Sequence, residues 1–418
     1  MKIHFIGIGG IGISALARKY LAEGKTVSGS DRSESPITKE LSTLGVEIKI
    51  GHAAANIPAD CDLIIYTIAI EPDNPELLEA KQRGIKLLTY PQALGLLSAE
   101  KYTIAISGTH GKTTTTAMIA KIMIDAGLDP TVIVGSLMKE NGYLTSVTNF
   151  IAGKSKYLVV EACEYRRSFL NLSPKILVIT NIDNDHLDYY QDLDDIKSAF
   201  AEFAAKLPAD GVLITEKEYS QITRPIKLQI PGEHNQKNAQ AALAVAQALR
   251  IEPIAARRSL AEFAGTWRRF EFKGKTKEGA LVYDDYAHHP TEIKATLAGA
   301  REMFPERRII VIFQPHLYSR TKLLSADFAA AFCNADEVIL LPIYAAREPF
   351  DSTVSSEMLA EAITKQGTKA ITLPDFISVQ NYLSTLTPTE ALSERELVII
   401  MGAGDIFELA PTLVIIKK

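Results

Sequence analysis

The sequence predicts an α/β fold with three domains. Short apolar runs alternate with amphipathic helical stretches along the whole chain, as in parallel sheets covered by helices. Two of these runs lead into glycine-containing turns, at residues 7–12 and 108–111. The length of 418 residues exceeds what one ordinary core accommodates. Ligands of open α/β sheets bind beyond the carboxyl ends of the strands, so we expect the chemistry at those ends.

The predicted strands are apolar runs, several of which end at polar or glycine residues. They cover residues 3–7, 27–30, 63–67, 102–107, 157–161, 176–180, 280–284, 309–313, 338–341, 370–373 and 397–401. A long alanine-rich helix is expected from residue 232 to 250, and another helix at 259–263. Seams near 98–101 and 264–267 then separate three domains, at 1–98, 99–264 and 265–418.

Composition narrows the class of protein. The net charge of -5 and the lack of a long basic run argue against a nucleic-acid binder. The cysteines Cys61, Cys163 and Cys333 stand far apart, so they suggest neither a disulfide framework nor a zinc site, and we expect a cytoplasmic protein. The N-terminus imitates a secretory signal, but its glycines fit a strand-to-helix turn. No other segment approaches the about 18 apolar residues of a membrane span.

The first glycine loop, GIGGIG at residues 7–12, follows a predicted strand and opens a helix. Asp31 stands nineteen residues after Gly12, at the end of the second strand. Gly9, Gly10 and Gly12 can admit a diphosphate to the helix N-terminus, and Asp31 can bind a ribose hydroxyl. Alone, the loop favours NAD. A UDP-sugar meets the same requirements, and a tight turn without ligand is the structural alternative.

The central loop, SGTHGKTTTT at residues 107–116, predicts a site for ATP phosphates. Lys112 would place its charge on the β- and γ-phosphates, Thr113 would put its hydroxyl on Mg²⁺, and backbone N–H groups would line the phosphates. The usual pattern needs glycine at position 106, where this chain has Ile106. The candidate ATP-binding residues of this loop are Gly108, Thr109, His110, Gly111, Lys112, Thr113 and Thr114.

Two neighbouring strand ends predict the rest of a metal shell. Glu161 ends one strand, and His186 closes the polar segment that follows another. With Thr113 they could hold a cation that phosphates already ligate in part. A capping acid and a structural histidine are the alternative.

Residues near the second seam suggest further nucleotide contacts. Asn235 and Asn238 open the alanine-rich helix and offer donors and acceptors that suit an adenine edge, although one of them could simply cap the helix. Arg268 and Arg269 lie at the junction with the third domain. An arginine there could offset charge developing at the γ-phosphate.

The third domain has two polar strand ends, DDYAHHPTE at 284–292 and QPHLYSRT at 314–321. Six of the eight histidines lie in strand-end segments along the chain. Zinc on His288, His289 and His316 has to be considered, but no metal-ligand spacing supports it, and phosphate chemistry explains these residues better.

Taken in order, these motifs resemble the Mur ligases, ATP-dependent enzymes that work on peptidoglycan precursors. The resemblance covers essentially the whole chain. Its motifs are GTHGKTT, Glu161, Asn181–His186, GEHNxxN at 232–238, RRFE at 268–271, DDYAHHPTE, QPHLYSRT and MGAGDI at 401–406. It implies an N-terminal Rossmann-like domain that binds the UDP-sugar, a central P-loop ATPase-like domain, and a C-terminal Rossmann-like domain for the amino acid.

The resemblance also implies roles for single residues. Lys112, Arg269 and Asp285 would contact the nucleotide, Thr113, Glu161 and His186 would hold Mg²⁺, and Asn235 and Asn238 would lie near adenine. Substrates would meet Gly9, Gly10, Gly12, Asp31, His288, His316 and Arg320. The C-terminal motifs favour the member that joins L-alanine to the lactyl carboxylate of UDP-N-acetylmuramate through an acyl phosphate. We expect small-molecule substrates, no nucleic-acid or membrane partner, and a monomer or weak homodimer.

Some positions depart from the family pattern. Cys163, Arg166 and Arg167 stand where acids are common, residues 67–70 read TIAI, and Leu317 occupies a frequent arginine position. Lys197 does not clearly match the lysine that some members carbamylate. A ligase that adds a peptide to the same sugar nucleotide remains an alternative, as do an NAD-dependent dehydrogenase and a nucleotide-sensing regulator without turnover.

Overall fold

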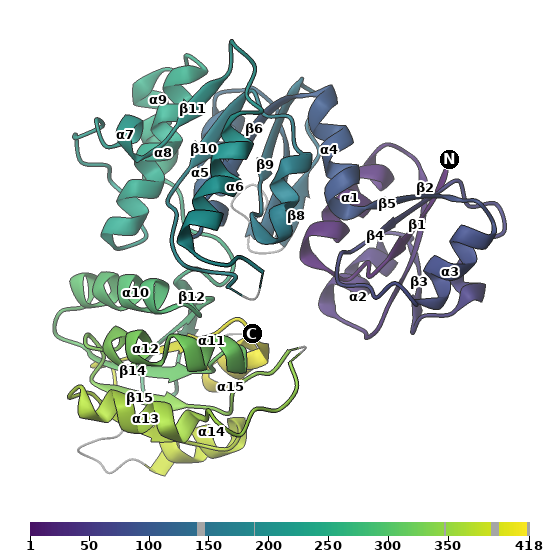
Figure 1. The fold of residues 1–418 in the computed structure, drawn as a ribbon. Coiled ribbons are helices and arrows are strands. Elements are labelled where there is room, and N and C mark those ends of the chain that lie inside the picture. Colours follow the sequence, from purple (N-terminus) through teal and green to yellow (C-terminus); the bar gives the residue numbers. More distant parts are fainter. Residues whose placement is uncertain (140–146, 188, 347, 386–392, 416–418) are drawn as a thin grey trace. The chain divides into compact units, whose positions relative to one another are not determined.

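The structure, a computed structural model, describes residues 1–139, 147–187, 189–346, 348–385 and 393–415. Three β-sheets organise these residues (Figure 1). The chain divides into two units. One contains Met1–Lys227 and Lys237–Glu262, and the other contains Leu228–Gln236 and Phe263–Lys418. The first unit holds two of the sheets and the second unit holds the third.

The first sheet has the strand order β3-β2-β1-β4-β5, and its neighbouring strands are parallel. Its strands are β1 (Lys2–Ile6), β2 (Thr26–Asp31), β3 (Glu47–Ile50), β4 (Leu63–Tyr66) and β5 (Lys86–Thr89). The helices between and after them are α1 (Ile11–Ala22), α2 (Pro36–Thr43), the short η1 (Ala54–Asn56), α3 (Pro75–Gln82) and α4 (Tyr90–Glu100). Chain order therefore alternates strand and helix, as the sequence predicts.

The second sheet has the order β11-β10-β6-β9-β7-β8, and only the β7–β8 pair in it is antiparallel. Its strands are β6 (Tyr102–Ser107), β7 (Thr131–Lys139), β8 (Val147–Ile151), β9 (Tyr157–Glu161), β10 (Ile176–Ile179) and β11 (Val212–Ile214). The accompanying helices are α5 (Lys112–Asp125), η3 (Tyr165–Asn171), α6 (Leu193–Ala204), α7 (Glu216–Tyr219), α8 (Glu233–Ala248) and α9 (Pro253–Ala261).

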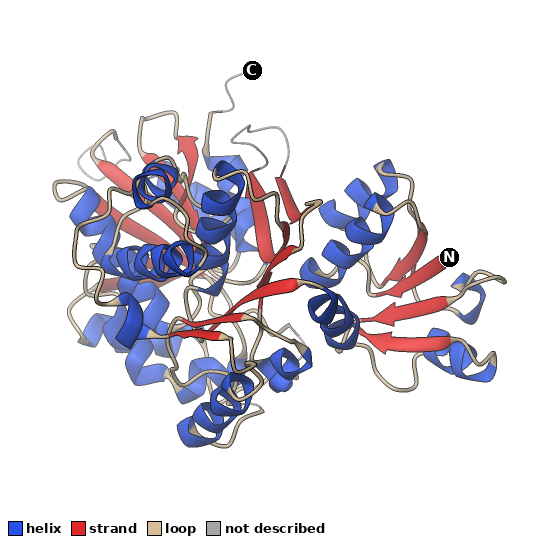
Figure 2. Cartoon of the chain, turned by 90° about the horizontal axis from the view of Figure 1, so that it is seen from above, coloured by secondary structure: helices blue, strands red, loops and turns tan. Residues whose placement is uncertain are grey.

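The third sheet has the order β12-β13-β17-β14-β15-β16, with β12 antiparallel to β13 and the other pairs parallel. Its strands are β12 (Glu271–Lys275), β13 (Leu281–Asp285), β14 (Arg308–Phe313), β15 (Glu337–Leu340), β16 (Lys369–Thr372) and β17 (Glu396–Met401). Its helices are α10 (Pro290–Met303), α11 (Tyr318–Leu323), α12 (Ser325–Ala331), α13 (Ser356–Lys365), α14 (Phe376–Thr385), η4 (Asp405–Leu409) and α15 (Ala410–Leu413). In each sheet the strands lie among helices (Figure 2).

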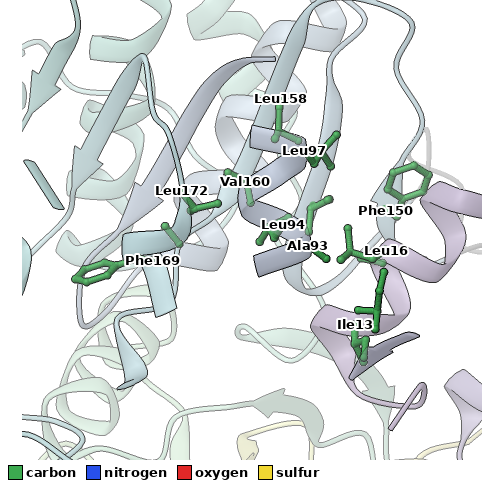
Figure 3. Packing of buried hydrophobic residues seen from close by; sticks show 14 of the residues in the cluster. Ile13, Leu16, Ala93, Leu94, Leu97, Phe150, Leu158, Val160, Phe169 and Leu172 are labelled. Atoms are coloured by element: carbon green, nitrogen blue, oxygen red, sulfur yellow. The ribbon is translucent and has the colours of Figure 1, made fainter. Parts of the chain in front are cut away.

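Within the first unit, a shared core connects the first two sheets. Buried residues of α1 and α4, such as Leu16 and Leu97, belong to the same cluster as Phe150 and Leu158 of the second sheet (Figure 3). Polar contacts add to it, because Asn149 of β8 donates to the Ser14 hydroxyl at 2.8 Å. Burial of these apolar side chains is the main stabilising term at this junction.

All eleven predicted strands are present, and those at 102–107 and 157–161 have the predicted bounds. The sequence pattern misses β3, β5, β7, β8, β11 and β12. All of these but β7 lie at sheet edges, and β3 and β12 among them expose side chains and lack a continuous apolar run.

The predicted helix bounds need correction. The helix expected at 259–263 is the end of α9, which begins at Pro253 and stops at Ala261, because Pro253 fits the first turn and Glu252 caps it. The long helix runs from Glu233 to Ala248, not from 232 to 250. The domain boundaries at 98/99 and 264/265 stay predictions. Among the described residues, no helix has the length and hydropathy to cross a membrane.

Candidate active site

The first glycine loop lies at the carboxyl edge of the first sheet. Gly7 has φ +79° and its N–H donates to the Ser30 carbonyl at 2.8 Å. The Gly9 N–H donates to the Asp31 carboxylate, also at 2.8 Å. A Cβ at Gly9 would lie 2.9 Å from the same carboxylate, and one at Gly12 would lie 2.9 Å from the Tyr90 ring. Gly9 and Asp31 therefore lie together at this edge, with Gly10 and Gly12 at the start of α1.

The central loop connects β6 to α5 and requires its glycines. Gly108 has φ +133° and Gly111 has φ +82°, which L side chains rarely adopt. A Cβ at Gly108 would lie 2.0 Å from the Thr180 hydroxyl, and one at Gly111 would lie 2.4 Å from the Asn238 side-chain oxygen. Ile106, which stands where the usual phosphate-loop pattern has glycine, is fully buried within β6 and is part of the strand.

The Lys112 ammonium is held by three acceptors. It donates to the carbonyls of Gly108 at 2.5 Å and Thr109 at 3.0 Å, and to Oε1 of Glu164 at 3.0 Å. Burial is the largest single cause and lowers the pKa of Lys112, but the nearby negative groups, first among them Glu164, together raise it by more, so the net shift is upward. Burial is the largest single cause and raises the pKa of Glu164, but Lys112, His186 and a backbone hydrogen bond together lower it by more. Both directions indicate a charged pair at neutral pH.

Thr113 and Glu161 form a second pair beside the loop. The Thr113 hydroxyl lies 3.1 and 3.0 Å from the two Glu161 carboxylate oxygens. The Gly135 N–H donates to Glu161 at 2.7 Å and fixes its orientation. A hydroxyl and a carboxylate are hard oxygen ligands, so this donor set fits Mg²⁺.

The other predicted ligand, His186, contacts Glu164 at 3.5 Å. Its ring lies 4.8 Å from the Tyr165 ring, and its backbone has φ +56°. Lys112 and His186 thus share one buried carboxylate. The sequence did not assign Glu164, and the signal that could have found it is its place just beyond β9, on the segment that opens with Glu161.

The polar segment after β10 supports the central loop. The Asn181 side chain accepts from the His110 N–H at 2.9 Å, and the His110 ring lies 3.1 Å from the Asp183 carboxylate. Thr109 accepts from the Asp183 N–H at 2.9 Å, while Thr114 is buried in the first turn of α5. Lys197 lies elsewhere, exposed on α6 and paired with an aspartate. The predicted ATP-binding residues of the loop are therefore positioned by two strand ends.

The two asparagines have different surroundings. Asn238 is buried, and its side-chain oxygen would lie 2.4 Å from a Cβ placed at Gly111. Asn235, in the second unit, donates to the Pro231 carbonyl at 2.6 Å. Their assignment to adenine stays a prediction.

In the second unit, the two arginines of the RRFE motif differ. Arg268 is 2% exposed and its Nε lies 3.2 Å from Asp284. Arg269 is 28% exposed, with its guanidinium 5.1 Å from the centre of the Tyr286 ring. Arg268 therefore stabilises the sheet, and Arg269 has the access that a ligand contact requires.

Asp285 lies beside these arginines at the end of β13. Its carboxylate accepts from the backbone N–H groups of Phe270 and Ala287, each at 2.7 Å. Burial raises the pKa of Asp285 to about 6, although these hydrogen bonds and Arg269 favour the charged form. A carboxyl group in this state can either accept or donate a hydrogen bond near neutral pH.

The three predicted substrate-binding residues of the third domain, His288, His316 and Arg320, lie together in the second unit. The His288 and His316 rings are 5.9 Å apart, and Nδ1 of His316 lies 3.3 Å from the Arg320 guanidinium. The His316 ring stacks on Tyr344. His289, considered above for zinc, accepts from the Thr291 N–H and caps α10.

Comparisons with known proteins agree along the whole chain. Three family models match in order. They are described as Mur ligase family, catalytic domain, over residues 2–102, Mur ligase middle domain, over 106–224, and Mur ligase, glutamate ligase domain, over 268–404.

A Clostridium tetani protein named UDP-N-acetylmuramate-L-alanine ligase is 43% identical, over 97% of this chain and 96% of the relative. A Clostridium acetobutylicum protein of the same name is 42% identical, over 98% and 96%. The crystal structure of UDP-N-acetylmuramate-alanine ligase from Thermotoga maritima superposes with a TM-score of 0.81 at 31% identity, covering 99% of this chain and 98% of that one. The fold, the order of the motifs and these full-length matches establish that this chain belongs to the Mur ligase family.

Proposed function

We propose that this chain is an ATP-dependent ligase that joins L-alanine to the lactyl carboxylate of UDP-N-acetylmuramate. The observation that carries the proposal is the full-length similarity to relatives named for this reaction. The convergence of Lys112, Thr113 and Glu161 at the central loop supports the ATP requirement. The role of each site residue is part of the proposal.

The proposed reaction has two steps. The lactyl carboxylate attacks the γ-phosphorus of ATP, which gives an acyl phosphate and releases ADP. The amine of L-alanine then attacks the acyl carbon, an amide bond forms, and inorganic phosphate and a proton leave. Catalysis of such steps rests on positioning and on offsetting charge.

Residues of this chain supply both effects. The Lys112 ammonium contacts the ATP phosphates, which replace the Glu164 carboxylate as its partner when ATP binds. Thr113 and Glu161 would hold Mg²⁺, which offsets phosphate charge when bound. Arg269 and Asp285 contact the nucleotide, His316 and Arg320 hold the amino acid, and His288 is a further substrate-binding residue. GIGGIG and Asp31 bind the UDP part.

Two alternatives differ from this proposal, one in the substrate and the other in the reaction. The structure of a murein peptide ligase from Psychrobacter arcticus has a TM-score of 0.70 at 24% identity, which is a likeness of fold. An NAD-dependent dehydrogenase would use the first loop but not the second. Cytoplasmic location and a monomer or weak homodimer also stay predictions.

One assay tests the proposal. The purified chain is incubated with ATP, Mg²⁺ and UDP-N-acetylmuramate, and ADP is followed while L-alanine, glycine, L-serine or the tripeptide is added. We expect ADP formation that depends on the sugar nucleotide and is greatest with L-alanine. Greater turnover with the tripeptide would favour the peptide ligase, and NADH binding without ADP formation would favour the dehydrogenase.

A further inference from the structure

Glu76 is a fully buried carboxylate that the proposed reaction does not use. A charge placed there is costly unless it is paired and hydrogen-bonded. Its partners come from several elements of the first domain and are His4, Ser30, His52, Ala53 and Asn56. Burial raises the pKa of Glu76, but the hydrogen bonds from His4, Asn56 and Ser30 lower it by more.

Glu76 determines which nitrogen of the His52 ring carries the proton. Nδ1 of His52 lies 3.1 Å from Oε1 of Glu76 and 3.2 Å from the Ser30 hydroxyl. The Ser30 hydroxyl donates to Glu76 at 2.8 Å, so both neighbours of Nδ1 act as acceptors. Nδ1 must therefore donate, and in the neutral ring Nε2 becomes an acceptor.

The second nitrogen distinguishes His52 from its neighbour His4. His4 is fully buried and uses both ring nitrogens, Nδ1 with Ser28 at 2.9 Å and Nε2 with Glu76 at 3.0 Å. Within the described part of the chain, nothing hydrogen-bonds Nε2 of His52, and its side chain is 18% exposed. His4 is a satisfied structural histidine, whereas His52 presents a fixed acceptor.

The location of His52 connects it with the first glycine loop. His52 follows the end of β3, and the preceding Gly51 N–H donates to the Asp31 carbonyl at 2.8 Å. Asp31 ends the neighbouring β2 and binds the Gly9 N–H. The glycine loop, Asp31 and His52 therefore lie at the carboxyl ends of β1, β2 and β3, in this order along the edge of the sheet. A nucleoside diphosphate with its diphosphate at the loop extends its ribose and base along this edge.

We propose that Nε2 of His52, oriented by Glu76, accepts a hydrogen bond from the nucleoside of the UDP-sugar and selects uridine over cytidine. The proposal rests on the assignment of the sugar nucleotide to the first domain. The donor is the uracil N3–H. Cytosine has an unprotonated N3 at the corresponding position, and two acceptors facing each other would weaken binding.

Binding of UDP to the full chain tests the proposal by calorimetry. The probes are UDP, N3-methyl-UDP, 2′-deoxy-UDP, 3′-deoxy-UDP and CDP. With the unmodified chain, we expect about 5- to 10-fold weaker binding of the analogue that lacks the recognised donor. The N3-methyl and deoxy analogues separate the base from the ribose. Equal affinity for UDP, N3-methyl-UDP and CDP, whatever the deoxy analogues show, would overturn the proposal.

Variants of His52 link the selectivity to this ring. His52→Phe keeps a ring without an acceptor and should weaken UDP by about 5- to 10-fold and remove the discrimination against the affected analogue. His52→Gln keeps an acceptor oxygen and should restore part of it. Glu47→Gln, at the opposite end of β3 with an exposed side chain, is the matched control. A His52→Phe variant that discriminates among the probes as the unmodified chain does would refute the assignment.

Glu76→Gln tests the orientation separately. A glutamine can donate to Nδ1 and turn Nε2 into a donor, so the preference should shift from UDP toward CDP. Should this variant fold poorly, the His52 variants decide alone. The two proposals can fail separately. If the unmodified chain forms ADP normally but does not distinguish UDP from CDP, only the assignment of His52 is contradicted. If the unmodified chain forms no ADP, the ligase function is contradicted.

Discussion

Replacing Lys112 with methionine should destabilise the first unit as well as abolish ATP turnover. The substitution leaves Glu164, 3% exposed, without the ammonium that lies 3.0 Å from its carboxylate. Removing one partner of a buried ion pair typically costs about 3–5 kcal/mol. We expect about 3 kcal/mol, because Lys112 is 14% exposed and His186 remains 3.5 Å from Glu164. That corresponds to a fall of about 6–12 °C in melting temperature for a domain of this size.

The second substitution separates charge from packing. Lys112→Met with Glu164→Gln removes both charges, so the double variant should regain much of the lost stability while ATP turnover stays absent. Differential scanning calorimetry without nucleotide gives the melting temperatures, and ADP release gives turnover. Lys121→Met is the control, since Lys121 belongs to a half-exposed pair on the same helix and should cost less than about 1 kcal/mol.

Two results would refute this reasoning. If Lys112→Met melts like the unmodified chain, the pair contributes no stability. If Glu164→Gln makes the Lys112→Met variant less stable, the buried carboxylate is not the cause of the loss.

The remaining predictions concern three other residues. Gly9→Val should abolish UDP-sugar binding and leave ATP binding intact, because a Cβ there lies 2.9 Å from the Asp31 carboxylate. Calorimetry showing the reverse would exchange the domain assignments. Arg320→Ala should raise the KM for L-alanine by about 10- to 150-fold and leave the KM for ATP within about threefold. A lower melting temperature with unchanged KM would mean a structural arginine. Relative to the unmodified chain, Asp285→Asn should gain up to about 3 kcal/mol of stability as pH rises from 4 to 7. Burial raises the pKa of Asp285 in the folded state to about 6, so ionisation of this carboxyl group costs the unmodified chain stability that the asparagine variant keeps. A pH-independent difference in urea unfolding would contradict this.

The strands at 102–107 and 157–161 could be predicted within their bounds because they are buried inside a sheet and their sequences are continuous apolar runs. The same is true of the glycine loops, since a left-handed backbone at Gly108 and Gly111 restricts the residue type. Edge strands such as β3 and β12 could not be predicted in this way, because water replaces part of their packing.

By itself, the sequence determined the fold class and the candidate residues at the strand ends, since local patterns carry the information for both. Tertiary structure alone decided which of those residues share a charge or a proton. Lys112 meets Glu164, which is 52 positions away, and His52 meets Glu76, which is 24 positions away. Neither spacing is a motif. The partners lie in loops and helix starts that follow parallel strands, and a buried carboxylate must take the donors that these segments supply.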